Sequence, residues 1–132
     1  MRGRSCSIRG GPLLLLWAAL AGCFGDAVEP VRDLVVQLES PNGRDAAAVI
    51  ELVGPGLSDV VATNGQVFTH VSGDTTRVVI LLDEPGPIEF TVRMAGLTFP
   101  GTAVVQVADD RDELRSLRGY RARLGSAGSR PR

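Results

Sequence analysis

Residues 88–94 read IEFTVRM, and apolar and polar side chains alternate at every step of this segment. Alternation with a period of two is typical of a β-strand that has one face in a core and the other in solvent. The apolar set, which we expect to point inward, is Ile88, Phe90, Val92 and Met94. The polar residues between them should point outward.

Strand-like segments recur on both sides of residues 88–94 and are separated by turn residues. We expect strands at 33–40, 47–53, 57–63, 66–71, 76–82, 102–108 and 120–124. The turns between them include Gly54-Pro55-Gly56, Asn64-Gly65, Ser72-Gly73-Asp74 and the loop 83–87. Seven to eight short strands, with a turn roughly every 8–12 residues, predict an all-β protein with a single antiparallel β-sandwich, jelly-roll or immunoglobulin-like.

Some segments lead to more specific expectations. Residues 76–82 form a nearly continuous apolar run, which is typical of a strand buried on both faces. Phe68 and Phe90 are both expected in the core. Residues 110–117 are the one candidate for a helical turn, because two leucines there are three positions apart. In the last strand, one face should carry Tyr120, Ala122 and Leu124, and the other Arg121 and Arg123.

Four segments of this pattern resemble the strands of cohesin-like domains. They are 48–57 (AVIELVGPGL), 65–68 (GQVF), 76–82 and 88–93. The resemblance covers about residues 47–108 and implies the jelly-roll sandwich that cohesin-like domains share with carbohydrate-binding modules. It includes no residues of a dockerin-binding face, so it implies a fold and not a partner.

The first 22 residues have the pattern of an export signal. Three arginines precede an apolar run from Leu13 to Ala21, which is about half of the ~20 residues that a membrane-spanning helix needs. The run ends in Leu20-Ala21-Gly22-Cys23, which resembles the lipobox of bacterial lipoproteins. The resemblance implies that the Cys23 thiol takes a diacylglycerol and that the chain is then cut just before Cys23. Conventional cleavage after Ala19-Leu20-Ala21 is the alternative.

The chain is therefore expected to comprise a signal peptide (1–22), a lipidated anchor and tether (23–30), a sandwich domain (31–125) and a disordered tail (126–132). Two or three acyl chains on Cys23 would hold the protein stably on a membrane. Phe24 stands where some Gram-negative lipoproteins carry the aspartate that retains them at the inner membrane. In a cell with an outer membrane, the resemblance therefore favours that membrane.

Cysteine and charge usage exclude several classes of function. Cys6 and Cys23 are the two cysteines, so no thiol remains after Cys23 for a disulfide, a metal site or a nucleophile. All fourteen basic residues are arginines. Residues 111–132 carry seven arginines and two acids, whereas residues 23–110 carry four arginines and thirteen acids. The basic end could face anionic lipid or polysaccharide, or simply be solvated. An acidic exported chain with few aromatics is not expected to bind nucleic acid.

Two groups of residues invite a chemical interpretation. His70 is the only histidine, and Ser72 and Asp74 follow it, but no G-x-S-x-G motif surrounds any serine. We therefore expect no enzymatic activity and no cofactor. A second group of four acidic residues could supply part of the six to eight oxygens that calcium needs. Arg111 within that group favours local charge pairing instead. The four acids are Asp109, Asp110, Asp112 and Glu113.

These observations predict a membrane-anchored lipoprotein of the bacterial cell envelope with a non-enzymatic structural or protein-interaction module. Edge strands of a sandwich can accept a partner strand without any special side chains. We expect the partner face at Arg121 and Arg123, with the acidic segments 83–84 and 109–113 as further candidates. The alternative is a carbohydrate-binding surface module. Its sugar-stacking residue would be Tyr120, because the one tryptophan lies in the signal peptide.

Overall fold

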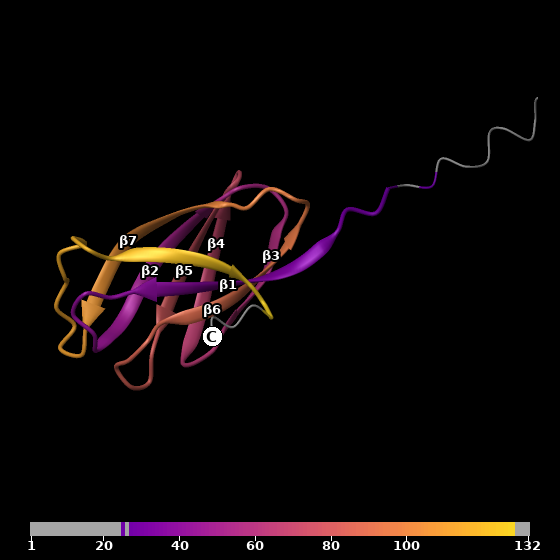
Figure 1. Ribbon diagram of the computed structural model, residues 1–132. Coiled ribbons are helices and arrows are strands. Elements are labelled where there is room, and N and C mark those ends of the chain that lie inside the picture. The colour runs from indigo at the N-terminus through magenta and orange to yellow at the C-terminus, as the bar shows by residue number, and fades with distance from the viewer. Residues whose placement is uncertain (1–24, 26, 129–132) are drawn as a thin grey trace, which may run out of the picture.

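The computed structural model describes residues 25 and 27–128, which contain eight β-strands and no helix. In chain order the strands are β1 (Val31–Glu39), β2 (Asp45–Val53), β3 (Leu57–Ala62), β4 (Gln66–Ser72), β5 (Thr75–Leu81), β6 (Glu89–Ala95), β7 (Gly101–Asp109) and β8 (Arg121–Ser126). Figure 1 shows how they stack into a sandwich. The predicted all-β sandwich is therefore confirmed.

The strands form two antiparallel sheets of four strands each. Sheet A has the order β3-β6-β1-β8, and sheet B has the order β4-β5-β2-β7. The pairing is nested, because β1 pairs with β8, β2 with β7, β3 with β6 and β4 with β5. Nested pairing results when one long antiparallel hairpin is wrapped around a core, which is the jelly-roll variant of the expected sandwich.

The core lies between the two sheets and is built by alternation. Ile88, just before β6, and every second residue of β6 are buried, as expected for 88–94. In β1 the same rule buries Leu34, Val36 and Leu38. Each sheet turns one face toward the other, so only every second side chain can reach the interior.

The expectation that residues 76–82 are buried on both faces is wrong. β5 lies inside sheet B, between β4 and β2, but only its alternate residues are buried. Leu81 points outward and is exposed. A two-layer sandwich covers only the inner face of each sheet, so even a central strand keeps one face in solvent. The apolar run therefore contributes to an exposed apolar surface.

Phe68 is not a core residue, contrary to expectation. Its side chain is 54% exposed on the outer face of sheet B, whereas Val67 packs against the core. Successive side chains of a strand point to opposite faces, so only one of these two can face inward. The pairing of Val67 with buried Ile80 decides which one does. Phe90 is buried as predicted.

No helical turn forms at 110–117. The chain instead turns back along β7, so that the Arg115 N–H donates to the Val107 carbonyl at 2.8 Å. Leu114 forms an isolated β-bridge with Ala108. The acidic side chain that begins this turn binds backbone amides just ahead of it, and such local hydrogen bonds compete with a helix.

Tyr120 is buried, so it cannot be the sugar-stacking residue of the alternative prediction. Its hydroxyl donates at 2.8 Å to Oδ1 of Asp45, a side chain that is itself only 1% exposed. The Nε of Arg115 lies 3.3 Å from the same oxygen, close enough for an ion pair but not aligned for a hydrogen bond. The amide of Asn42 donates to the Tyr120 hydroxyl at 3.2 Å. This network ties the start of β2 to the start of β8.

The ends of the domain differ slightly from expectation. β8 includes Ser126, so the predicted tail 126–132 begins inside a strand, and residues 129–132 lie outside the described part. The Pro30 carbonyl accepts a hydrogen bond from the Gly96 N–H at 2.9 Å, which fixes the last residue of the predicted tether to the sandwich. The signal peptide and Cys23 also lie outside the described residues.

Candidate interaction surface

A two-sheet sandwich has four edge strands, and the outward amide and carbonyl groups of an edge strand can pair with another chain. Here the edges are β3 and β8 in sheet A and β4 and β7 in sheet B. Proteins usually protect such edges with charges, bulges or covering segments. The four edges of this sandwich differ sharply in this respect.

Three of the edges are protected, each in its own way. Residues 113–115 cover the end of β7, and Val105 is an extra residue in the pairing of β7 with β2. The pairing of β3 with β6 is interrupted around Asp59, whose φ is 46°. β8 carries two outward arginines, Arg121 and Arg123.

β4 has no such protection. All seven of its residues pair with β5 in unbroken register, from Gln66 opposite Leu81 to Ser72 opposite Thr75. Its sequence, QVFTHVS, contains no acidic residue, lysine, arginine or proline and is rich in residues that favour strands. Within the described part of the chain, no strand pairs with its other side. We call Gln66–Ser72 the open edge.

The outer face of sheet B continues the open edge as an apolar surface. Phe68 lies opposite Val79, which lies opposite Val49, so one apolar row crosses three strands. The outer face of sheet A carries more ion pairs, Arg93 with Asp33 and Asp59 and Arg123 with Glu39, whereas that of sheet B carries the pair of Arg77 with Glu51. Contiguous exposed apolar surface marks binding sites in soluble domains. Sheet B is therefore the candidate binding side.

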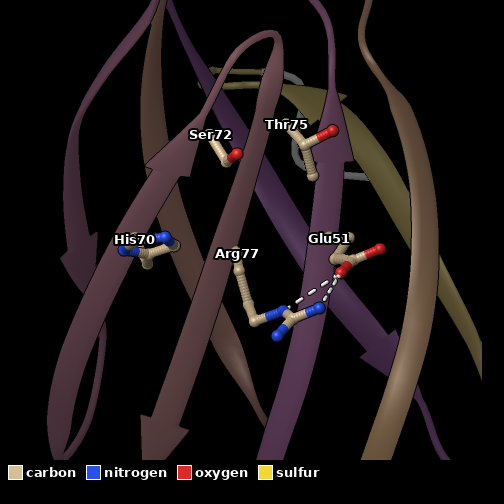
Figure 2. Close-up of a pocket in the computed structure, with 5 residues that line it drawn as sticks. All are labelled: Glu51, His70, Ser72, Thr75 and Arg77. Carbon is tan, nitrogen blue, oxygen red and sulfur yellow. Dashed lines mark hydrogen bonds and ion pairs between the residues drawn. The ribbon is translucent and has the colours of Figure 1, made fainter.

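A polar row borders this apolar surface (Figure 2). His70, Arg77 and Glu51 occupy neighbouring strands, and Nε of Arg77 donates to Oε1 of Glu51 at 3.0 Å. Together with Ser72 they border an open hollow of about 250 Å³, which is below the ~300–1,000 Å³ of typical small-molecule sites. Ser72 shares the face of His70 as expected, but Asp74 does not line the hollow. Glu51 is the acidic residue that lines the hollow with His70, and its carboxylate pairs with Arg77.

Asp109 organises the turn after β7. Its Oδ1 accepts hydrogen bonds from the N–H groups of Arg111 and Glu113 at 2.9 and 3.0 Å. These bonds stabilise the ionised carboxylate and hold the pKa of Asp109 below its ordinary value of 3.8. Asp110 pairs with Arg44 at 3.1 Å. In the part of the chain that the structure describes, no three acidic, histidine or cysteine side chains converge on a possible metal position.

We expect this turn to loosen in acid. Because the folded-state pKa of Asp109 is lowered, its ionised form contributes stability above the ordinary value of 3.8, and this contribution is lost as the pH falls through the folded-state pKa. Amide exchange of Arg111 and Glu113, measured by NMR from about pH 5 to about pH 2 and corrected for intrinsic rates, should lose protection. The amide of Val79 in sheet B is the control. Equal loss at Val79 would indicate global unfolding instead.

The predicted partner face on β8 is partly neutralised. Arg123 pairs with Glu39, and Arg121 lies opposite the same glutamate in the strand register. The acidic segment 83–84 lies beside the Asn64-Gly65 turn, at the start of the open edge. The sequence prediction missed the open edge itself. Its signal was a strand without charges between two turns, but only the strand pairing shows that this strand is an edge.

Comparisons with protein-family models, with curated proteins and with solved structures gave no match. Among residues 25 and 27–128 there is no helix long and apolar enough to cross a membrane. The lipobox residues lie outside the described part of the chain. The function is therefore inferred from the surface geometry and from the N-terminal sequence pattern.

Proposed function

We propose that this protein is a lipid-anchored, non-enzymatic module of the bacterial cell envelope that binds a partner protein by strand addition at the open edge. The observation that supports this function best is β4, a regular and uncharged edge strand in a sandwich whose other edges are protected. Strand addition obtains affinity from main-chain hydrogen bonds and specificity from alternate side chains. It therefore leaves no sequence motif.

The surroundings of β4 indicate what the partner strand should look like. A strand added beside β4 would place every second side chain on the same face as Phe68 and His70. An aromatic or β-branched residue opposite Phe68 would extend the apolar row, and each such cross-strand pair contributes about 0.2–1 kcal/mol. The acidic segment 83–84 favours a basic residue at that end of the partner strand.

The anchor at Cys23 supplies location. One acyl chain gives only marginal membrane binding, whereas two or three hold a protein on the bilayer. Phe24 after the cysteine favours the outer membrane where the cell has one. Confinement to the envelope raises the effective concentration of the module near a partner in the same compartment, so a modest strand-addition affinity is sufficient there.

Replacing Thr69 with lysine tests this function. Thr69 lies in the middle of the open edge, on the same side of β4 as Val67, but its side chain is exposed. A charged side chain that points inward from an edge strand is one way in which proteins block strand addition. Capture of the partner by full-length tagged Thr69→Lys protein from its own cells should fall at least about tenfold, which corresponds to ~1.4 kcal/mol. Ser58→Lys, at an exposed site on β3, is the matched control and should leave capture unchanged. Equal effects of both substitutions would exclude the open edge.

A carbohydrate-binding role is the second candidate, and one observation favours it. Phe68 presents an exposed aromatic ring next to the polar row of His70, Arg77 and Glu51. Ligand sites commonly combine such an apolar face with a few polar groups that fix orientation. Glycan-array binding by the wild type that is lost in Phe68→Ala would place surface polysaccharide ahead of a protein partner.

A further inference from the structure

The two ends of the sandwich differ in charge. At one end lie the start of β1, where the chain carries Glu29 and Arg32, and the connections 54–56, 73–74, 96–100 and 127–128. Asp74 is the one charged residue of these four connections. At the opposite end lie the connections 40–44, 63–65, 82–88 and 110–120, which carry nine charged residues. The chain leads from the first end toward Cys23. In Figure 1 it leaves the sandwich beside the loop between β6 and β7.

This weakly charged end exposes large apolar side chains. On the β6–β7 loop, Leu97 is 72% and Phe99 is 48% exposed. Val28 and Val31, on the chain that leads into β1, are also exposed. These apolar residues lie together at one end of the domain, next to the segment that joins β1 to Cys23. They form a surface suited to contact with the apolar part of a membrane.

Contacts fix the β6–β7 loop to the anchor side of the chain. The Gly96 N–H donates to the Pro30 carbonyl, and Nη2 of Arg32 donates to the Gly96 carbonyl at 3.4 Å. The Arg32 guanidinium also lies 5.6 Å from the centre of the Phe99 ring. An arginine stacked on an aromatic ring joins a cation to an apolar side chain, and such amphipathic groups suit the membrane interface.

The distance to the anchor is short. Cys23 precedes Pro30 by seven residues, and seven residues span at most about 25 Å even when fully extended. A lipid on Cys23 would therefore keep the weakly charged end close to the bilayer. Apolar groups of interfacial proteins enter the headgroup and acyl boundary to a depth of about 5–10 Å. The exposed loop side chains are within reach of that layer.

We propose that Leu97 and Phe99 insert into the interfacial layer of the membrane that carries the anchor, where Arg32 meets a lipid phosphate. This inference rests on the proposed lipidation of Cys23. Insertion would orient the domain with its weakly charged end against the membrane and its charged end away from it. The open edge ends at Ser72 on the membrane side and would run away from the bilayer, so it would stay accessible to a partner.

A single tryptophan reports this insertion. Trp17 is the one tryptophan of the chain, so two reporters are built in a Trp17→Phe background. Phe99→Trp places the reporter on the loop, and Phe68→Trp places a similarly exposed control on sheet B. The full-length proteins are reconstituted into vesicles of phosphatidylcholine and phosphatidylglycerol, with or without brominated acyl chains. Bromine should quench the Phe99→Trp fluorescence at least about twofold, because the ring would lie in the interfacial layer, and leave Phe68→Trp unchanged.

Absence of quenching in Phe99→Trp, or equal quenching in both proteins, would overturn the inserted loop. Mass spectrometry of the N-terminal peptide, on the same samples, separately reports acylation of Cys23. An acylated peptide without quenching leaves the anchor intact and rejects insertion. An N-terminal peptide without acylation of Cys23 rejects the anchor. Quenching of the Phe99→Trp fluorescence by an excess of brominated vesicles then still shows whether the β6–β7 loop enters a bilayer.

Discussion

Phe90→Ala is expected to lower the free energy of unfolding by about 3–5 kcal/mol, because it leaves a cavity in a fully buried part of the core. Domains of this size have only about 5–15 kcal/mol of stability in total. The domain that follows Cys23 contains no cysteine and hence no disulfide to compensate. Thermal unfolding followed by circular dichroism should show a midpoint lower by about 4–8 °C for each kcal/mol lost.

Phe68→Ala is the matched control for Phe90→Ala. The same side chain is removed, but from an exposed position on the outer face of sheet B, so the cost should stay below about 1 kcal/mol. A cost for Phe68→Ala as large as that for Phe90→Ala would mean that Phe68 is in the core. The orientation of β4, and with it the apolar outer surface, would then be wrong.

Cys23→Ala should release the protein from the membrane almost completely. Each buried methylene of an acyl chain contributes about 0.8 kcal/mol, so loss of the two or three chains proposed on Cys23 would remove the binding that we propose holds the protein on the bilayer. Fractionation of cells should show wild-type protein in the membrane pellet and the Cys23→Ala protein outside it. The wild-type N-terminal peptide should carry the mass of the acyl chains on Cys23.

A wild-type N-terminus at Gly22 with unmodified Cys23 would support conventional cleavage after Ala19-Leu20-Ala21 instead. Cys6→Ala is the control for loss of a thiol as such, because Cys6 lies within the predicted signal peptide. It should leave membrane attachment unchanged. Release of both cysteine variants would point to a general defect in export rather than to a missing anchor.

Local alternation was sufficient to predict most of the strands. In 88–94 the apolar and polar positions are unambiguous, and all four inward residues are buried. The alternation is ambiguous where neighbouring residues are both apolar. Val67 and Phe68 compete for the core in this way, and the register with β5 decides the outcome. In 76–82 both faces of the strand are apolar, so the sequence does not show which of the two faces the core.

The interaction surface could not be predicted from local pattern because edges are created by long-range pairing. In sheet B, β5 lies between β4 and β2, and β2 pairs in turn with the distant β7. This order leaves β4 as the outermost strand. Tyr120 illustrates the same limit, since its hydroxyl is buried in a hydrogen bond to Asp45, 75 positions away in the sequence. The arginines of β8 were visible in the sequence, but the ion pair of Arg123 with Glu39 was not.

Photo-crosslinking in living cells probes strand addition at β4 at the site of contact. p-Benzoyl-phenylalanine replaces Phe68 in the full-length protein, and Ser58 on β3 in the control. We predict one discrete protein adduct from position 68, formed with an extended segment of the partner, absent from position 58 and reduced in a Cys23→Ala background. Equal protein adducts from both positions, no adduct from position 68, or an adduct with polysaccharide alone would contradict a membrane-held module that binds a protein through β4.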